Sequence, residues 1–412
     1  MSYRMRQNIF IIACVTLCVF LISCQRGKNP GMSYELKSHN EPHIGAKFCQ
    51  SERSAFWITE DERDGIRSIC YYDFISETSG FLCGKAECTH ESDSCDAAAG
   101  EKGSGSGLCY YENRLYWMAD RYDPNGGYLG RYLLSEKTDG TDRQIVRQLY
   151  APDDQLNMIT GNMLTLCVGG YYVISGDAHI VENGENINVL LIEAFPMKED
   201  SCEVIFREEG EGRIYICASD DLLYYSVVNQ DDLSEDESWK QNSYLRLYLR
   251  DFPLNKSECL FDEAVSFYLW EFTVISGKLV LTTMSDLYSD CQLYSFDLVS
   301  RELKKEFDFP GDSKDTYANI GNTYAVLYKS YRGNSKRELT LKDLETNEVS
   351  QFSVQSSMMD SEGRGFSRIF AGSNQKFLFY IFRNYTDDGR MIEYVTAYMP
   401  ETCKEIILWK SE

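Results

Sequence analysis

The 412-residue chain carries 64 acidic and only 41 basic residues, for a formal net charge of −23. This balance argues against nucleic-acid binding, because phosphate recognition needs a basic surface. The 29 tyrosines and 21 phenylalanines, set against 8 prolines, favour β-strands. We therefore expect an acidic all-β protein with no nucleic acid among its partners.

The N-terminus has the pattern of an export signal. Two arginines precede an apolar run from Ile9 to Ile22, which is too short to span a bilayer comfortably. The run ends in Leu21-Ile22-Ser23-Cys24, which resembles the lipobox of bacterial lipoproteins, where a small residue precedes the acylated cysteine. We expect residues 1–23 to be a lipoprotein signal peptide and Cys24 to be the lipid attachment site. An ordinary signal peptide, or a membrane-anchoring helix with an incidental cysteine, is the alternative.

Lipidation would hold the mature protein at the extracytoplasmic face of a bacterial cell envelope, with the membrane as a partner through the acyl chains of Cys24. Residues 24–53 are poor in apolar side chains and contain the turn sequences Asn29-Pro30-Gly31 and Asn40-Glu41-Pro42. This segment is predicted to be a flexible tether that precedes a folded domain at residues 54–412.

A short alternating strand, a polar turn and a second strand recur as one unit along the folded domain. The seven hairpins of this kind begin at Ser68, Arg131, Leu191, Arg246, Gln292, Glu338 and Tyr394. Most follow another pair of apolar runs around a Gly-, Asn- or Ser-containing turn, which is the pattern of antiparallel hairpins. Two hairpins per repeat make a four-stranded sheet of the size of a propeller blade.

The repeats therefore predict an all-β fold, a β-propeller of seven four-stranded blades. Six or eight blades, or a stack of β-sandwiches, are the alternatives. The segment 43–50 (HIGAKFCQ) would supply the first strand of blade one, so that the ring needs no separate closing strand.

Six cysteines recur at equivalent positions of different blades. Three are expected in the same inner strand of successive blades, namely Cys109, Cys167 and Cys217. Three follow the turn of the outer hairpin, namely Cys202, Cys259 and Cys403. Such recurrence indicates packing in the core as small apolar residues. The three inner cysteines would lie a blade apart, too far to pair with one another.

Cys83, Cys88, His90 and Cys95 fall outside the repeat, in a segment expected to be a loop between blades one and two. Three thiolates and one imidazole meet the ligand count of a tetrahedral zinc or iron site. The spacing does not match the common C-x2-C pairs. A disulfide within the loop, with Cys70 or Cys49 as further partners, and free thiols are the alternatives.

The same residues carry a family resemblance. Leu82-Cys83, Cys88-x-His90 and Cys95-x-Ala97, followed by the strand pair YYENRLYW (110–117), resemble uncharacterised propeller-type surface lipoproteins (TolB-like or WD40-like) of clostridial gut bacteria. The resemblance implies a surface-anchored β-propeller, and it implies no known activity or ligand.

No catalytic set stands out in the sequence. A G-x-S-x-G elbow, a Rossmann fingerprint, a P-loop and sialidase-type Asp boxes are missing, and outside the tether only His90 and His179 occur. The sequence therefore favours a binding or sensing module for a glycan, peptide or partner protein over an enzyme. The alternatives are a carbohydrate-active hydrolase or lyase that uses Asp/Glu pairs, and a structural envelope protein that docks a membrane partner.

A ligand-binding face is expected where the longest insertions gather. Residues 121–130, 176–188 and 229–243 would join the second and third strands of consecutive blades and emerge on one face. Tyr122, Tyr128 and Trp239 would offer rings for stacking there. Surface insertions without a ligand are the alternative.

Overall fold

The computed structural model describes residues 47–59, 67–85, 87–90, 95–101, 104–154, 158–182, 184–229, 243–284, 291–309, 317–321, 323–330, 336–355, 367–374, 376–385 and 391–410. All of them belong to one unit of the chain, Ser38–Glu412. The predicted signal peptide, Cys24, most of the predicted tether and Trp239 lie outside the described residues.

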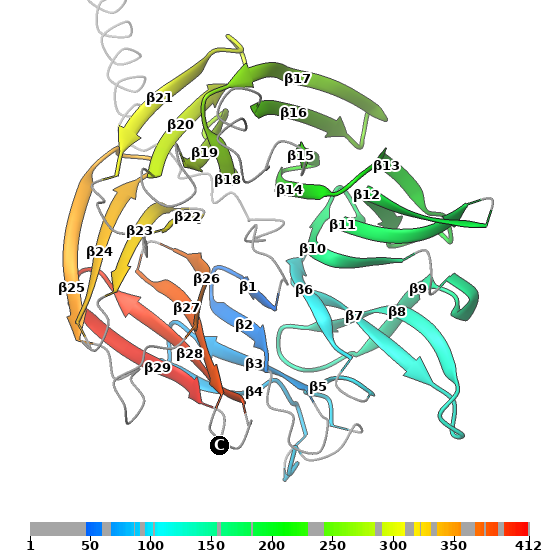
Figure 1. Cartoon of the computed structure of the whole chain (residues 1–412). Coiled ribbons are helices and arrows are strands. Elements are labelled where there is room, and N and C mark those ends of the chain that lie inside the picture. Colours follow the sequence, from blue (N-terminus) through cyan, green and yellow to red (C-terminus); the bar gives the residue numbers. More distant parts are fainter. Residues whose placement is uncertain are drawn as a thin grey trace, which may run out of the picture. The chain divides into compact units, whose positions relative to one another are not determined.

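Seven antiparallel sheets form a ring, and the strands of each sheet lie side by side in chain order (Figure 1). Blade one contains β1 (Phe48–Gln50), β2 (Ser54–Ile58), β3 (Arg67–Asp73), β4 (Thr78–Phe81) and the short β5 (Ala98–Gly100). Blades two and three contain β6 (Ser106–Tyr111), β7 (Arg114–Tyr122), β8 (Tyr128–Lys137), β9 (Gln144–Tyr150), β10 (Ile159–Val168), β11 (Tyr171–Glu182), β12 (Glu185–Pro196) and β13 (Glu203–Glu209).

Blades four and five contain β14 (Gly212–Ser219), β15 (Leu222–Asn229), β16 (Ser243–Asp251), β17 (Lys256–Val265), β18 (Tyr268–Ile275), β19 (Lys278–Met284), β20 (Cys291–Asp297) and β21 (Leu303–Asp308). Blades six and seven contain β22 (Tyr317–Ile320), β23 (Tyr324–Ser330), β24 (Lys336–Asp343), β25 (Val349–Gln355), β26 (Ser367–Ser373), β27 (Leu378–Tyr385), β28 (Met391–Met399) and β29 (Lys404–Lys410). The predicted β-propeller with seven four-stranded blades is thereby confirmed.

An aspartate begins the turn between the third and fourth strands in several blades. The carboxylate of Asp297 accepts hydrogen bonds from the backbone N–H groups two and three residues later, both at 2.9 Å. The turn then closes through Arg301, which has a φ of 61°. The carboxylates of Asp73 and Asp343 accept the corresponding two backbone hydrogen bonds in blades one and six. Because an Asx turn of this kind fixes a tight hairpin, the local sequence sets the spacing of the repeat.

The ring closes between the first and last blades by packing. β1 is the innermost strand of blade one and β29 the outermost strand of blade seven, so neither blade borrows a strand from the other terminus. The rings of Phe48 and Phe379 lie 5.0 Å apart, and Gln50 Nε2 donates to the carbonyl oxygen of Ser373 at 3.2 Å. Phe48–Gln50, the end of the segment 43–50, thus forms the first strand, and the folded sheet includes residues that the sequence assigned to the tether.

The structure separates the six recurrent cysteines into two groups. Three lie on the innermost strands β6, β10 and β14 and are buried as predicted, namely Cys109, Cys167 and Cys217. The other three are exposed, so the prediction of burial was wrong for Cys202, Cys259 and Cys403. The reason lies in strand position: an inner strand is covered on both faces, whereas the outermost strand, and the turn that leads into it, border the solvent.

The inner thiols of neighbouring blades also lie closer together than their spacing in the sequence suggested. Cys109 Sγ donates to Thr165 Oγ1 of blade three at 3.5 Å. Burial, followed by a hydrogen bond with Cys109, raises the pKa of Cys167 well above its usual value. Cys109 and Cys167 therefore lie within hydrogen-bonding reach across the seam between two blades, and no disulfide joins them, as expected.

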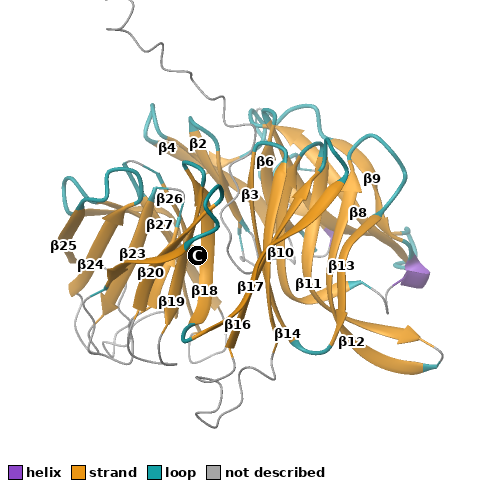
Figure 2. Ribbon diagram, turned by 90° about the horizontal axis from the view of Figure 1, so that it is seen from above, coloured by secondary structure: helices purple, strands orange, loops and turns teal. Residues whose placement is uncertain are grey.

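Helical structure is scarce. A 3-10 turn, Pro152–Asp154, lies wholly within the described ranges, and no helix within them has the length and hydropathy needed to cross a lipid bilayer. Strand direction alternates within each sheet, so all connections from a second to a third strand leave the same face of the ring. On that face the β11–β12 hairpin extends beyond the neighbouring strands (Figure 2).

Candidate metal centre

The Cys/His cluster lies on an insertion into the outermost strand of blade one. β4 and β5 both pair with β3, one after the other. Between them, the N–H of Leu82 donates to the carbonyl of Ile69 at 2.8 Å, and the N–H of Ile69 donates to the carbonyl of Ala97 at 2.7 Å. The chain therefore leaves the strand after Leu82 and rejoins it at Ala97. We call residues 83–96 the knuckle; it interrupts a strand and is not the inter-blade loop that the sequence predicted.

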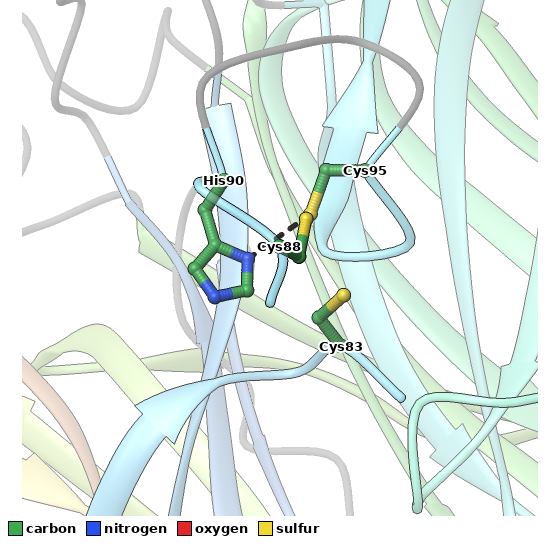
Figure 3. A group of neighbouring side chains, drawn as sticks. All are labelled: Cys83, Cys88, His90 and Cys95. Atoms are coloured by element: carbon green, nitrogen blue, oxygen red, sulfur yellow. Dashed lines mark hydrogen bonds between the residues drawn. The ribbon is translucent and has the colours of Figure 1, made fainter. Parts of the chain in front are cut away.

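The four predicted ligands converge. Cys83, Cys88, His90 and Cys95 point toward one another, and their donor atoms all lie within 4.8 Å of each other (Figure 3). Nδ1 of His90 is 3.2 Å from Sγ of Cys95. Cys95 is 3% exposed and the other three are half-buried. Donors around a tetrahedral zinc ion are about 4 Å apart, so a small contraction would complete such a site.

Backbone amides surround the sulfur atoms. The N–H of Ala97 donates to Cys95 Sγ at 3.3 Å. Burial opposes ionisation of Cys83, but hydrogen bonds from the backbone of Lys85 and from the neighbouring thiols outweigh it and lower its pKa. Burial raises the pKa of Cys95 to about 12, although the Ala97 amide works in the opposite direction. Metal binding at the cluster would therefore release protons, because the ligands bind as thiolates.

Local contacts fix the shape of the knuckle. Lys85 and Asp96, near its two ends, form an ion pair at 2.8 Å. Glu87 and His90 have φ values of 63° and 61°, which turn the chain sharply around the cluster. The ring of His90 lies 4.7 Å from that of Phe81, the last residue of β4.

The further disulfide partners considered from the sequence do not join the cluster. Cys49 and Cys70 lie on β1 and β3 and pack in apolar clusters of the core, Cys70 between blades one and seven. No disulfide joins any of the twelve cysteines within the described ranges. A pairing among Cys83, Cys88 and Cys95 themselves remains the alternative to a metal.

Two charged residues at the base of the knuckle were missed in the sequence. Glu136, on β8, is 0% exposed, and burial raises its pKa to about 8 even though the Arg143 charge lowers it. Arg143 follows the next turn, with Nε 3.7 Å from Glu136 Oε2. No signal in the sequence marks them, because a Glu and an Arg beside a polar turn usually face the solvent.

The predicted stacking residues pack on each other. The rings of Tyr122 and Tyr128 are 5.7 Å apart at 64°, and both side chains are half-buried. They flank a tight turn, in which the N–H of Asp123 donates to the carbonyl of Gly127 at 2.7 Å. Trp239 lies outside the described residues, so a shared stacking surface stays a prediction.

The second predicted insertion is a hairpin. Residues 176–188 continue the ladder of β11 and β12 as far as the Glu182–Glu185 pair. The alternation of buried and exposed side chains continues through His179, Ile180 and Val181, so this segment extends the strands and the prediction of an irregular loop was wrong. His179 is exposed and hydrogen-bonds across the hairpin to Asn188.

The fold and the cluster together define a seven-bladed β-propeller with a Cys3His group inserted into its first blade. No family model matches the sequence, and no curated protein is significantly similar to it.

Several solved structures have a similar fold. A prolyl endopeptidase is 10% identical, with a TM-score of 0.42 over 89% of this chain and 56% of that chain. The acylaminoacyl peptidase of Pyrococcus horikoshii is 11% identical, with a TM-score of 0.44 over 87% and 50%. An oligogalacturonate lyase in complex with manganese is 12% identical, with a TM-score of 0.44 over 89% and 91%. The chain spans about half the length of the peptidases, and similarity at this level carries no argument about activity.

Proposed function

We propose that this protein is a lipid-anchored extracytoplasmic binding module whose propeller is stabilised by a zinc ion at Cys83, Cys88, His90 and Cys95. The observation that carries the zinc proposal is the convergence of three thiols and one imidazole within 4.8 Å. Four protein donors fill a tetrahedral coordination sphere and leave no open position for a substrate, which is the arrangement of structural zinc.

Zinc is favoured over iron and over a disulfide for two reasons. A redox-inert ion suits a structural site in the oxidising surroundings of an exported protein. A disulfide would give no role to His90, whose Nδ1 lies 3.2 Å from Cys95 Sγ. Zinc would join the two ends of the knuckle and replace the core that so short a segment lacks.

Metal analysis of the full-length chain, purified without oxygen, tests this centre. We expect about one zinc per chain, and its loss in Cys88→Ser and in His90→Ala. Cys202→Ser, which removes an exposed thiol outside the cluster, should keep the metal. Iron at the same stoichiometry would replace zinc in the proposal. A blank analysis with fewer free thiols than cysteines would overturn it in favour of the disulfide.

The lipid anchor is supported by Leu21-Ile22-Ser23-Cys24 at the end of the apolar run. In the native host, Cys24→Ala should abolish acylation and change the membrane association of the protein. Unchanged fractionation and an unchanged lipid-labelling signal would rule the anchor out.

Ligand binding is proposed for the face that carries the connections between second and third strands. The connections between the second and third strands of blades two, three and four all leave the ring on this face, and the β11–β12 hairpin projects from it. Deleting residues 230–241 should abolish capture on a glycan or peptide array while thermal unfolding changes little. Val299→Asp serves as control, because Val299 is 91% exposed on a turn of the opposite face.

Two other results would change this part of the proposal. Capture that survives the deletion would move the site to the other face. Cleavage of an arrayed glycan would favour the carbohydrate-active hydrolase or lyase, and a complete absence of capture would favour the structural envelope protein.

A further inference from the structure

A single arginine of blade two holds the end of the knuckle. Arg143 Nη1 donates to the carbonyl oxygen of Cys95 at 3.2 Å, and its Nη2 donates to the carbonyl oxygen of Ala98. The guanidinium lies over the ring of Trp117, 5.0 Å from its centroid. One side chain therefore binds the backbone of a predicted metal ligand and the strand that follows it.

Arg143 also faces a buried carboxyl group. Its Nε faces Glu136 Oε2 at 3.7 Å, and Glu136 is fully buried, with neither carboxylate oxygen hydrogen-bonded to a described residue. Two further acidic groups act on this pair, Asp96 in the knuckle and Asp139 in the turn between β8 and β9. Since burying the carboxyl group of Glu136 is costly, and the Arg143 charge beside it reduces that cost, the contact favours one position of the guanidinium.

The same turn of blade two packs backbone to backbone against the start of the knuckle. A Cβ at Gly140 would lie 3.1 Å from the backbone N atoms of both Cys83 and Gly84. Gly140 also has a φ of 77°, which favours glycine. Blade two thus contacts both ends of the knuckle, through Gly140 at Cys83 and through Arg143 at Cys95.

We propose that Arg143 is a positioning residue of the metal centre, through which zinc binding is coupled to the seam between blades one and two. The inference rests on the proposed zinc site. Arg143 touches no donor atom, but it fixes the carbonyl of Cys95 and so restricts where Sγ of that residue lies. Outer partners of this kind typically change metal affinity by about 10–100-fold.

Coupling of this kind acts in both directions. If the seam orients Cys95 for zinc, bound zinc must stabilise the seam by the same free energy. Zinc is therefore expected to protect backbone amides from hydrogen exchange on both sides of the seam. In blade one these are the amides of the knuckle and of β5, and in blade two those of the β8–β9 hairpin.

The first test measures zinc affinity by competition with a chelator, in the full-length chain. Arg143→Ala should weaken zinc binding by about 10–100-fold. Arg143→Lys keeps the charge but cannot span both carbonyls, so its zinc affinity should lie between those of the wild type and Arg143→Ala. Cobalt bound in place of zinc should keep its thiolate-to-metal absorption bands in both variants, because every ligand is still present.

Arg114→Ala is the matched control. Arg114 lies in the same blade, is buried to a similar degree (19% exposed against 24%) and forms hydrogen bonds with Ser135 and Asp142. It does not bind the knuckle in any of these contacts, so zinc affinity should be unchanged. An Arg143→Ala variant that binds zinc like the wild type would overturn the inference.

A second measurement needs no variant and covers the case in which Arg143→Ala fails to fold. Hydrogen exchange of the wild-type chain with and without zinc should differ in residues 98–101 and 133–144, and not in β19 of blade five. A wild type that binds no zinc contradicts the proposed function itself. A wild type that binds zinc with no change in residues 133–144 contradicts only the coupling.

Discussion

Gly140 shows at the scale of one residue how the knuckle constrains blade two. Its backbone conformation, with a φ of 77°, costs an L-residue about 1–2 kcal/mol. Its close approach to Cys83 and Gly84 adds a second constraint, because backbone atoms cannot move aside as a side chain can. Gly277 has the same φ of 77°, but a Cβ there would meet nothing within 4 Å.

We therefore expect Gly140→Ala to lower the melting temperature more than Gly277→Ala does. Both substitutions place an alanine at a positive φ, but only at Gly140 would the added Cβ contact the backbone of the knuckle. Thermal unfolding of the two variants beside the wild type measures the difference. Equal losses would mean that the contact between blade two and the knuckle contributes nothing beyond strain.

At the scale of strands, the sequence predicted the repeating hairpins but not the interruption of one strand. The repeats could be predicted because each hairpin has its own alternation of apolar and polar residues and its own turn, such as the one at Asp297. β5 is only Ala98-Ala99-Gly100, which has no strand-like pattern, so its pairing with β3 could not be read from the residues. The ligands were found because their residue types are informative without any structure, whereas Glu136 and Arg143 gain their role only from the packing of two blades.

Strand position also predicts the reactivity of the cysteines. We expect Cys202, Cys259 and Cys403 to react with a thiol reagent in the native protein. The buried thiols of the innermost strands should react only after unfolding, because the thiolate is the nucleophile and burial raises the pKa of Cys167 and Cys217 well above the usual value. Alkylation mapped by mass spectrometry, with and without denaturant, measures both groups.

The cluster serves as an internal comparison in that experiment. Zinc-loaded Cys83 and Cys88 should be protected although they are half-buried, and a chelator should make them reactive without denaturant. Modification of Cys109 in the native state would contradict the assignment of the inner strands to the core.

At the scale of the whole molecule, the closure of the ring depends on side chains at one seam. None of the described strands is shared between blades one and seven, and the junction is held by apolar packing and by a few buried polar contacts. Gln50 is 0% exposed and makes two of them: its Nε2 donates to the carbonyl of Ser373, and its Oε1 accepts from Asn374 Nδ2 at 3.1 Å. Truncating it would leave groups on blade seven without these partners.

We expect Gln50→Ala to reduce the free energy of unfolding by about 1–3 kcal/mol, the usual cost of leaving a buried polar group unsatisfied. Gln148→Ala is the control, since Gln148 is exposed and donates only to carbonyls of its own blade, Leu129 and Tyr150. Urea unfolding of both variants gives the two free energies, and hydrogen exchange in β1 and β26 shows whether the loss is local to the seam. Equal effects of the two substitutions would contradict a closure that depends on Gln50. A loss confined to Gln50→Ala, with faster exchange in both strands, would mean that the ring opens first where its two ends meet.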